Sequence, residues 1–149
     1  MVLMAYWREK KVFLNNSFGK SLDILHRTMD ASTIRQQVLA NNIANADTPN
    51  FKRSSLNFES ELKRALESEG VHVPGAAMTN EKHIPFSHVE NYRDVKPTRF
   101  LDYISQADNN GNNVDAEQES MLLLQNQLRY DLLTRSVSNQ FTQLNIVLR

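Results

Sequence analysis

The residues best suited to chemistry in this chain are two histidines, His83 and His88, and the acidic residues around them. Three carboxylates lie close by in the sequence: Glu81, Glu90 and Asp94. Imidazole and carboxylate groups together are common ligands of divalent metal ions. The spacing matches no zinc pattern, however, and Pro85 interrupts helical geometry between the two histidines. We therefore expect surface or loop histidines and no metal site.

Other kinds of catalytic site find equally little support. The chain has no cysteine, which excludes thiol catalysis, disulfides and thiolate metal sites. No glycine-rich phosphate loop, nucleophile elbow or His-Glu-x-x-His motif occurs, and the serines have no partner base visible in the sequence. His26 lies beside an apolar stripe, where a partly buried structural histidine is expected rather than a ligand or a base. We expect no enzyme, no cofactor and no small-molecule substrate.

Composition sets the class of protein. The chain has 149 residues, and its 17 basic and 17 acidic residues cancel, so neither nucleic acid nor an anionic membrane is expected as the main partner. No stretch approaches the ~20 apolar residues of a membrane span. The apolar segment 2–7 is short and meets the charged run 8–11, which is not the layout of a cleavable signal peptide. We expect one domain at most.

The segment 41–51 is the most informative local feature. Three asparagines, Asn41, Asn42 and Asn45, fall within five residues where the upstream pattern indicates a helix. Asparagine is a poor helix former, and Pro49 biases the residue before it away from helical geometry. Asn50 then occupies the position of a type II turn that needs a positive φ. The predicted turn motif consists of Thr48, Pro49, Asn50 and Phe51.

This segment resembles a signature of the axial proteins of the bacterial flagellum, the rod, hook and hook-associated proteins. These proteins carry Asn-Asn-Ile-Ala-Asn, two variable residues, a threonine, a turn and an aromatic residue near the N-terminus. The chain matches this pattern from Asn41 to Phe51, with Asn50 where the family usually has glycine. Asparagine is the mildest replacement for glycine at a positive φ, so we expect the turn to be kept.

Three helices are predicted around a weakly patterned middle. Apolar residues spaced by four and three predict a helix over 17–46, with Ser17 as its N-cap. A shorter helix is predicted over 58–69, capped by Asn57. The last begins near Asp115, whose spacing to Gln118 suits a capping box, and runs almost to Arg149. We expect a mainly α fold in which the two long helices pack as a coiled-coil-like pair, beside an irregular or weakly β middle segment.

The expected organisation follows these elements. Residues 1–16 form an N-terminal extension that either anchors on a partner or is disordered. Residues 17–69 form the N-terminal helical part of a rod domain, 70–113 the irregular or extended middle segment, and 114–149 the C-terminal helix of the same domain. Within 52–55, two adjacent basic residues suggest phosphate contact only weakly, and we expect a solvated connector.

The last helix carries two apolar stripes about 160° apart. The first contains Leu123, Gln127, Tyr130, Thr134, Val137, Phe141, Leu144 and Leu148, and the second Met121, Leu124, Leu128 and Leu132. One partner helix buries only one stripe, so we expect other subunits to cover the remaining surface. The residues expected at the subunit interface are Leu22, Leu25, Met29, Leu39, Asn41, Asn42, Ile43, Asn45, Leu124, Leu128, Tyr130, Val137, Phe141 and Leu144. A soluble coiled-coil adaptor that binds one partner helix explains the stripes equally well, but not the asparagine motif.

The C-terminal part narrows the resemblance to the short proximal-rod members of the family. The asparagine-rich turn 108–115 and the block from Asn126 to Tyr130 are similar to their C-terminal region. The resemblance implies a subunit of the proximal rod that polymerises into a helical tube. It also implies export through the flagellar type III apparatus without a cleaved signal. The implied partners are further copies of the chain, the rod proteins FlgC and FlgF, the FliE adaptor, the MS ring and the export gate.

Overall fold

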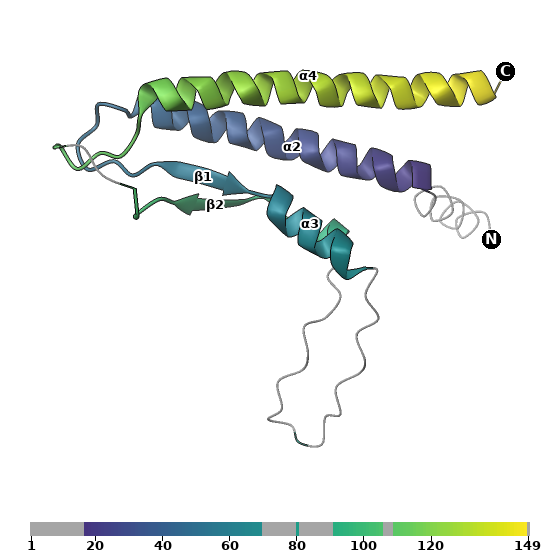
Figure 1. Cartoon of the computed structure of the whole chain (residues 1–149), viewed down its shortest axis with the longest axis horizontal. Coiled ribbons are helices and arrows are strands. Elements are labelled where there is room, and N and C mark those ends of the chain that lie inside the picture. The colour runs from purple at the N-terminus through teal and green to yellow at the C-terminus, as the bar shows by residue number, and fades with distance from the viewer. Residues whose placement is uncertain (1–16, 70–79, 81–90, 106–108, 149) are drawn as a thin grey trace, which may run out of the picture. The chain divides into compact units, whose positions relative to one another are not determined.

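The computed structural model describes residues 17–69, 80, 91–105 and 109–148 (Figure 1). The elements follow one another as α2 (Ser17–Ala44), β1 (Ser54–Asn57), α3 (Glu59–Ser68), the 3-10 helix η1 (Tyr92–Asp94), β2 (Thr98–Leu101) and α4 (Ala116–Val147). The predicted mainly helical fold is confirmed: two long terminal helices pack together, and a short helix and a small sheet lie between them in the sequence.

The chain divides into two compact units. The first comprises residues 1–55 and 101–149, and the second residues 56–100. In the first unit α2 and α4 run antiparallel, side by side along their lengths (Figure 1). At 1.5 Å per residue, their 28 and 32 residues span about 42 and 48 Å.

The two long helices begin and end for local reasons. The Asp115 side chain caps α4, because one of its oxygens accepts hydrogen bonds from the backbone N–H groups of Glu117 and Gln118. Helix α2 ends at Ala44, two residues before the predicted end. There the N–H of Asn45 donates to the carbonyl of Asn42, which tightens the chain into a turn.

In the second unit α3 packs against η1. Phe58, Leu62 and Ala65 share the buried face of the short helix, and Tyr92 is buried in η1. The predicted cap is wrong by one residue, because Phe58 occupies the N-cap position and no side chain caps the helix there. Asn57 instead accepts a hydrogen bond from the Ser60 hydroxyl.

The strands β1 and β2 pair in a two-stranded antiparallel sheet (Figure 1). β1 falls partly in the segment 52–55, which was expected to be a solvated connector. That expectation is wrong, because Ser54 is buried and Arg53 forms an ion pair with a buried carboxylate. Among the described residues no helix has the length and apolar character needed to cross a membrane.

Candidate assembly surface and the polar node behind it

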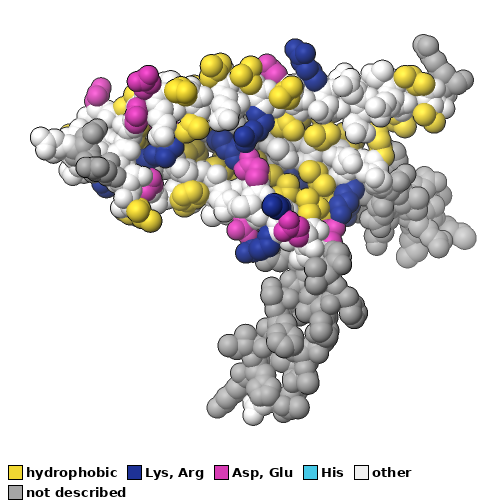
Figure 2. Space-filling view, viewed as in Figure 1, with side chains coloured by type: hydrophobic (Ala, Val, Ile, Leu, Met, Phe, Trp, Pro, Cys, Tyr) yellow, Lys and Arg dark blue, Asp and Glu magenta, His cyan; other side chains and the backbone are white. Residues whose placement is uncertain are grey.

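One face of α4 carries large apolar side chains that no part of the described chain covers. We call Met121, Leu124, Leu128 and Leu132 the outer stripe. Their exposed fractions are 68%, 58%, 58% and 66%. Figure 2 shows hydrophobic side chains gathered along the α4 edge of the molecule. A row of such side chains at helical spacing is a surface suited to another helix.

The opposite face of α4 is turned inward. Buried or half-buried side chains recur there at spacings of four and three, with one gap of seven: Glu119, Leu123, Asn126, Leu133, Val137, Gln140 and Leu144. This inner seam differs from the first predicted stripe, because Gln127 and Thr134 are exposed and Phe141 is 45% exposed. Compared with the prediction, α4 is turned about its own axis. The polar residues Glu119 and Asn126 face α2, and Gln127, Thr134 and Phe141 do not.

The residues expected at the subunit interface take different places in the structure. On α4, Leu124, Leu128, Tyr130 and Phe141 are exposed, and Val137 and Leu144 are half-buried. On α2 and in the turn directly after it, Asn41 is exposed, Leu39 and Asn42 are buried, and the others are half-buried: Leu22, Leu25, Met29, Ile43 and Asn45. Leu39 and Asn42 thus have almost no surface left for another subunit, whereas the remaining twelve stay predictions.

Asn42 is the centre of a buried polar node. Its side-chain Nδ2 donates to the Ser54 carbonyl and to Glu119 Oε2, each at 2.8 Å, and its Oδ1 accepts from the Ser54 N–H at 3.0 Å. Every hydrogen-bonding group of this amide except one acceptor lone pair is thereby used within the chain. Asn42 ties α2, β1 and α4 together, a role that the sequence did not reveal.

Glu119 is a fully buried carboxylate one turn into α4. Its Oε1 lies 2.5 Å from Arg53 Nε, and the Arg53 side chain is only 20% exposed. A buried carboxylate is tolerated only with a counter-charge and hydrogen bonds, and Arg53 and Asn42 supply them. The node therefore consists of Asn42, Arg53, Ser54 and Glu119, from three segments of the first unit.

Two asparagines of the loop before α4 bind the chain segment that follows α2. This is the loop end of the α2–α4 hairpin, where α2 ends and α4 begins. Asn112 Nδ2 lies 2.8–2.9 Å from three carbonyl oxygens, those of Asn45, Ala46 and Thr48. Asn113 accepts from the Arg53 N–H at 2.7 Å and donates to the Asp102 carbonyl at 2.8 Å. The run 109–113, which the sequence indicated only as a turn, thus holds the turn that follows α2 against the start of α4.

The turn 48–51 has the conformation that the sequence predicts. Asn50 has a φ of 61°, and the Phe51 N–H donates to the Thr48 carbonyl at 3.3 Å. Gly111 faces this turn with a φ of 78°, and a Cβ atom on it would lie 2.6 Å from Asn50 Oδ1. The side chain at position 50 therefore limits what position 111 accepts.

We expect Gly111→Ala to destabilise the chain by about 1–3 kcal/mol, from its positive φ and the clash with Asn50. In an Asn50→Gly background the same substitution should cost less, because only the φ penalty remains. Urea unfolding of the two single variants and the double variant measures this coupling. Equal costs of Gly111→Ala in both backgrounds would show that the contact has no energetic weight.

Asp102 organises the chain after β2. Its carboxylate accepts hydrogen bonds from the Ser105 hydroxyl and N–H and from the Ile104 N–H. These hydrogen bonds, the Ser105 hydroxyl foremost, hold the pKa of Asp102 below its usual value, and the charge of Arg53 adds to the effect. The turn leaves Tyr103 and Ile104 pointing into solvent.

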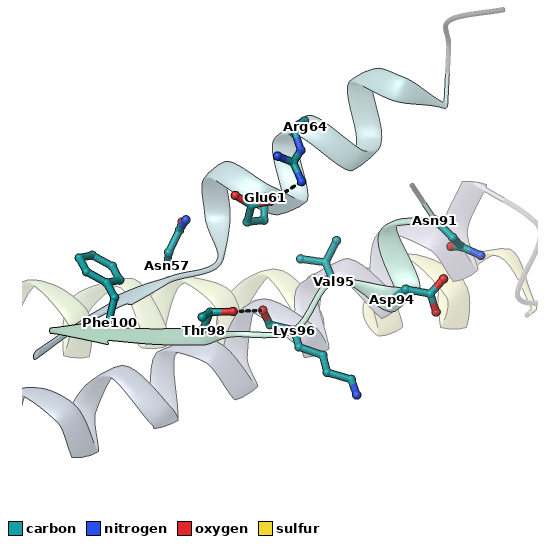
Figure 3. Close-up of a pocket in the computed structure, with 9 residues that line it drawn as sticks. All are labelled: Asn57, Glu61, Arg64, Asn91, Asp94, Val95, Lys96, Thr98 and Phe100. Carbon is teal, nitrogen blue, oxygen red and sulfur yellow. Dashed lines mark hydrogen bonds and ion pairs between the residues drawn. The ribbon is translucent and has the colours of Figure 1, made fainter. Parts of the chain in front are cut away.

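The second unit contains a hollow of about 680 Å³ between α3 and the segment 91–100. Figure 3 shows Glu61 and Arg64 paired with each other on its wall and Asp94 pointing away from them. Its charged groups are thus of both signs and do not converge on one point, so they form no evident acid–base or nucleophile–base pair.

Of the four histidines, only His26 lies in the part of the chain that the structure describes. His26 is exposed on α2, so the expected partial burial is wrong. His72, His83 and His88, with Glu81 and Glu90, lie outside the described residues, so the structure does not test their expected loop positions. Within the described ranges no three His, Asp or Glu side chains are close enough to share a metal ion.

Comparison with known proteins accounts for the asparagine-rich motif. The family model for flagella basal body rod proteins matches residues 22–52, which include the asparagine-rich end of α2 and the turn. The flagellar basal body rod protein FlgB of Borreliella burgdorferi is 45% identical over 90% of this chain and 99% of its own length. The chain belongs to the FlgB family. The FlgB proteins of Bacillus subtilis and Escherichia coli are 32% and 34% identical over 88% and 77% of the chain, and 95% and 83% of their own lengths.

Membership of the FlgB family makes the chain a rod subunit of the flagellar basal body, a structural class rather than a family of enzymes. It also implies assembly with other components of the rod and basal body. Sequence reasoning missed five positioning residues: Arg53, Asn112, Asn113, Glu119 and Asn126. Only Asn112 and Asn113 gave a signal, as members of the asparagine-rich run before α4.

Proposed function

We propose that this chain polymerises through its terminal helices into the proximal rod, a helical tube that transmits torque and conducts exported subunits. The outer stripe carries the proposal, because it leaves an apolar helix face uncovered in a protein of a rod family. Burying the exposed part of four such side chains is worth about 5 kcal/mol gross per contact. Head-to-tail contacts that do not close on themselves would extend this into a tube.

The residues proposed for these contacts are those expected at the interface that retain surface. Leu124, Leu128 and Phe141 present it on α4, and Leu22, Leu25 and Met29 are half-buried on α2. Asn41 and Asn45 lie near the loop end of the hairpin, where amide groups can hydrogen bond across a contact. The turn 48–51 exposes three of its four residues at the same end.

The finer placement follows from the family resemblance. We propose FlgC, FlgF, the FliE adaptor and the MS ring as neighbours in the assembly. We further propose a periplasmic location, reached through the flagellar type III export gate without a cleaved signal. Each of these rests on the proposal that the chain occupies the proximal part of the rod.

Concentration dependence tests the polymer directly. The purified chain should show a weight-average mass that keeps rising with concentration in sedimentation velocity, because open contacts have no preferred final number of subunits. Electron microscopy of the most concentrated samples should show filaments or open oligomers. A mass that saturates at a small fixed stoichiometry, or stays monomeric at all concentrations, would contradict the proposal and support an adaptor that binds one partner.

A further inference from the structure

The packing of α2 on α4 poses a problem of register. Four apolar residues along α4 are spaced by seven: Leu123, Tyr130, Val137 and Leu144, of which Tyr130 is 37% exposed and the other three are half-buried. Sliding the two helices by one heptad would replace apolar side chains with apolar side chains at much of the contact. Apolar burial is non-directional, so it discriminates poorly between such registers.

Polar groups meet across the helix pair at two separate levels. Asn42 on α2 donates to Glu119 on α4, and Asn126 on α4 donates to the Ser32 carbonyl on α2, both at 2.8 Å. All four residues are buried, with exposed fractions of 4% or less. The Asn42–Glu119 hydrogen bond requires one axial alignment of the two helices. Asn126 reaches a backbone carbonyl at Ser32, whose side chain is small, and a slip by seven residues would place Leu25 or Leu39 at that level.

Asn126 indicates that these groups do more than add stability. Its Oδ1 is buried and accepts no hydrogen bond from any described residue. A half-satisfied buried amide stabilises less than a well-packed leucine would. Stability alone therefore does not explain an asparagine at position 126. The best-attested use of a buried polar residue between helices is to select one alignment of the helices.

We propose that Asn42, Glu119 and Asn126 form a register lock, which selects a single axial alignment of α2 and α4. A slip by one heptad would separate Glu119 from Asn42 and Asn126 from the Ser32 carbonyl, whereas the native alignment pairs them. Arg53 joins the lock through Glu119 and so ties the alignment to β1. The outer stripe is on α4 and the turn 48–51 follows α2, and both belong to the first unit. The register lock therefore also fixes how far apart the two lie along the helix axes.

The absence of cysteine makes the alignment directly measurable. Spin labels on Gln36→Cys in α2 and Ser138→Cys in α4, both exposed positions, would be the only labelled sites. One heptad corresponds to about 10 Å along a helix axis, so a slip changes the axial offset of the labels by that amount. Electron–electron double resonance on the full chain resolves such a change.

The decisive variant replaces all three lock residues: Asn42→Leu, Glu119→Leu and Asn126→Leu. The parent chain should give one narrow distance peak, and the triple variant should remain helical but show a second population displaced by about 10 Å. Asn126→Leu alone, which removes one level, should show a smaller second population. A single unshifted peak in both variants would overturn the proposal. So would a triple variant that is unfolded by circular dichroism, because the three residues would then supply stability rather than register.

Discussion

Replacing Leu128 with aspartate is expected to abolish rod assembly and swimming while leaving the single chain folded. Leu128 is 58% exposed at the middle of the outer stripe, so a charge there costs the monomer little. In an assembled rod the same carboxylate would be buried against an apolar neighbour without a partner, at a cost of several kcal/mol. Swimming in soft agar should fall to the level of a strain lacking the protein. Phe141→Asp should behave alike, since Phe141 is also exposed on α4.

Gln127→Asp provides the matched control. Gln127 is the preceding residue of α4, is also exposed, and lies outside the outer stripe, so the substitution adds the same charge and helix cost. Thermal unfolding should give similar midpoints for both variants and the parent chain, and only Leu128→Asp should lose assembly. Normal swimming in the Leu128→Asp and Phe141→Asp strains would remove the outer stripe from any role in the rod.

Asn42→Ala is expected to be the most destabilising substitution of a single polar residue in the chain. It leaves the buried Glu119 carboxylate without one of its donors and the Ser54 N–H and C=O without their side-chain partners. Buried groups left unsatisfied in this way cost about 1–3 kcal/mol each, and more when charged, so we expect a total near 3 kcal/mol. For a chain of this size that lowers the unfolding midpoint by about 6–12 °C.

Asn41→Ala is the natural comparison, because Asn41 is the preceding residue of α2 and its side chain is exposed. Urea unfolding should place this variant within about 0.5 kcal/mol of the parent chain. A loss in Asn42→Ala that is no larger than in Asn41→Ala would mean that the node is not a significant source of stability. A double-mutant cycle with Arg53→Leu would then show whether Glu119 is held chiefly by the arginine.

The long helices and the turn between α2 and β1 were predictable because their determinants are local. The Asp115 cap, the four-and-three spacing on α4 and the positive φ of Asn50 each depend on residues within a few positions. The same reasoning predicted an apolar face of α4 that its own chain leaves uncovered. The predicted N-cap of α3, Asn57, was wrong by one residue, because the helix has Phe58 at that position. An error of this size is common at helix boundaries.

The strand β1 and the polar node were not predictable in this way. Arg53 and Ser54 were interpreted as part of a solvated connector, because all four residues of the segment 52–55 are polar. Arg53 pairs with Glu119 on α4, 66 residues away. The Ser54 backbone bonds to Asn42, which itself bonds to Glu119, 77 residues away. Glu119 lies in the first turn of α4, where the helix dipole by itself favours an acidic residue, so nothing in the sequence indicated its burial.

Periodicity and capping were thus enough to establish two long helices, the turn after the first, and an excess of apolar surface on the last. Which asparagines face inward, and which face of α4 meets α2, emerged only when distant segments came together. The reason is physical. A helix is stabilised by contacts between residues three and four apart, but a polar side chain can be buried only where another group forms hydrogen bonds with it. For Asn42 and Asn126, that group belongs to the other helix of the pair.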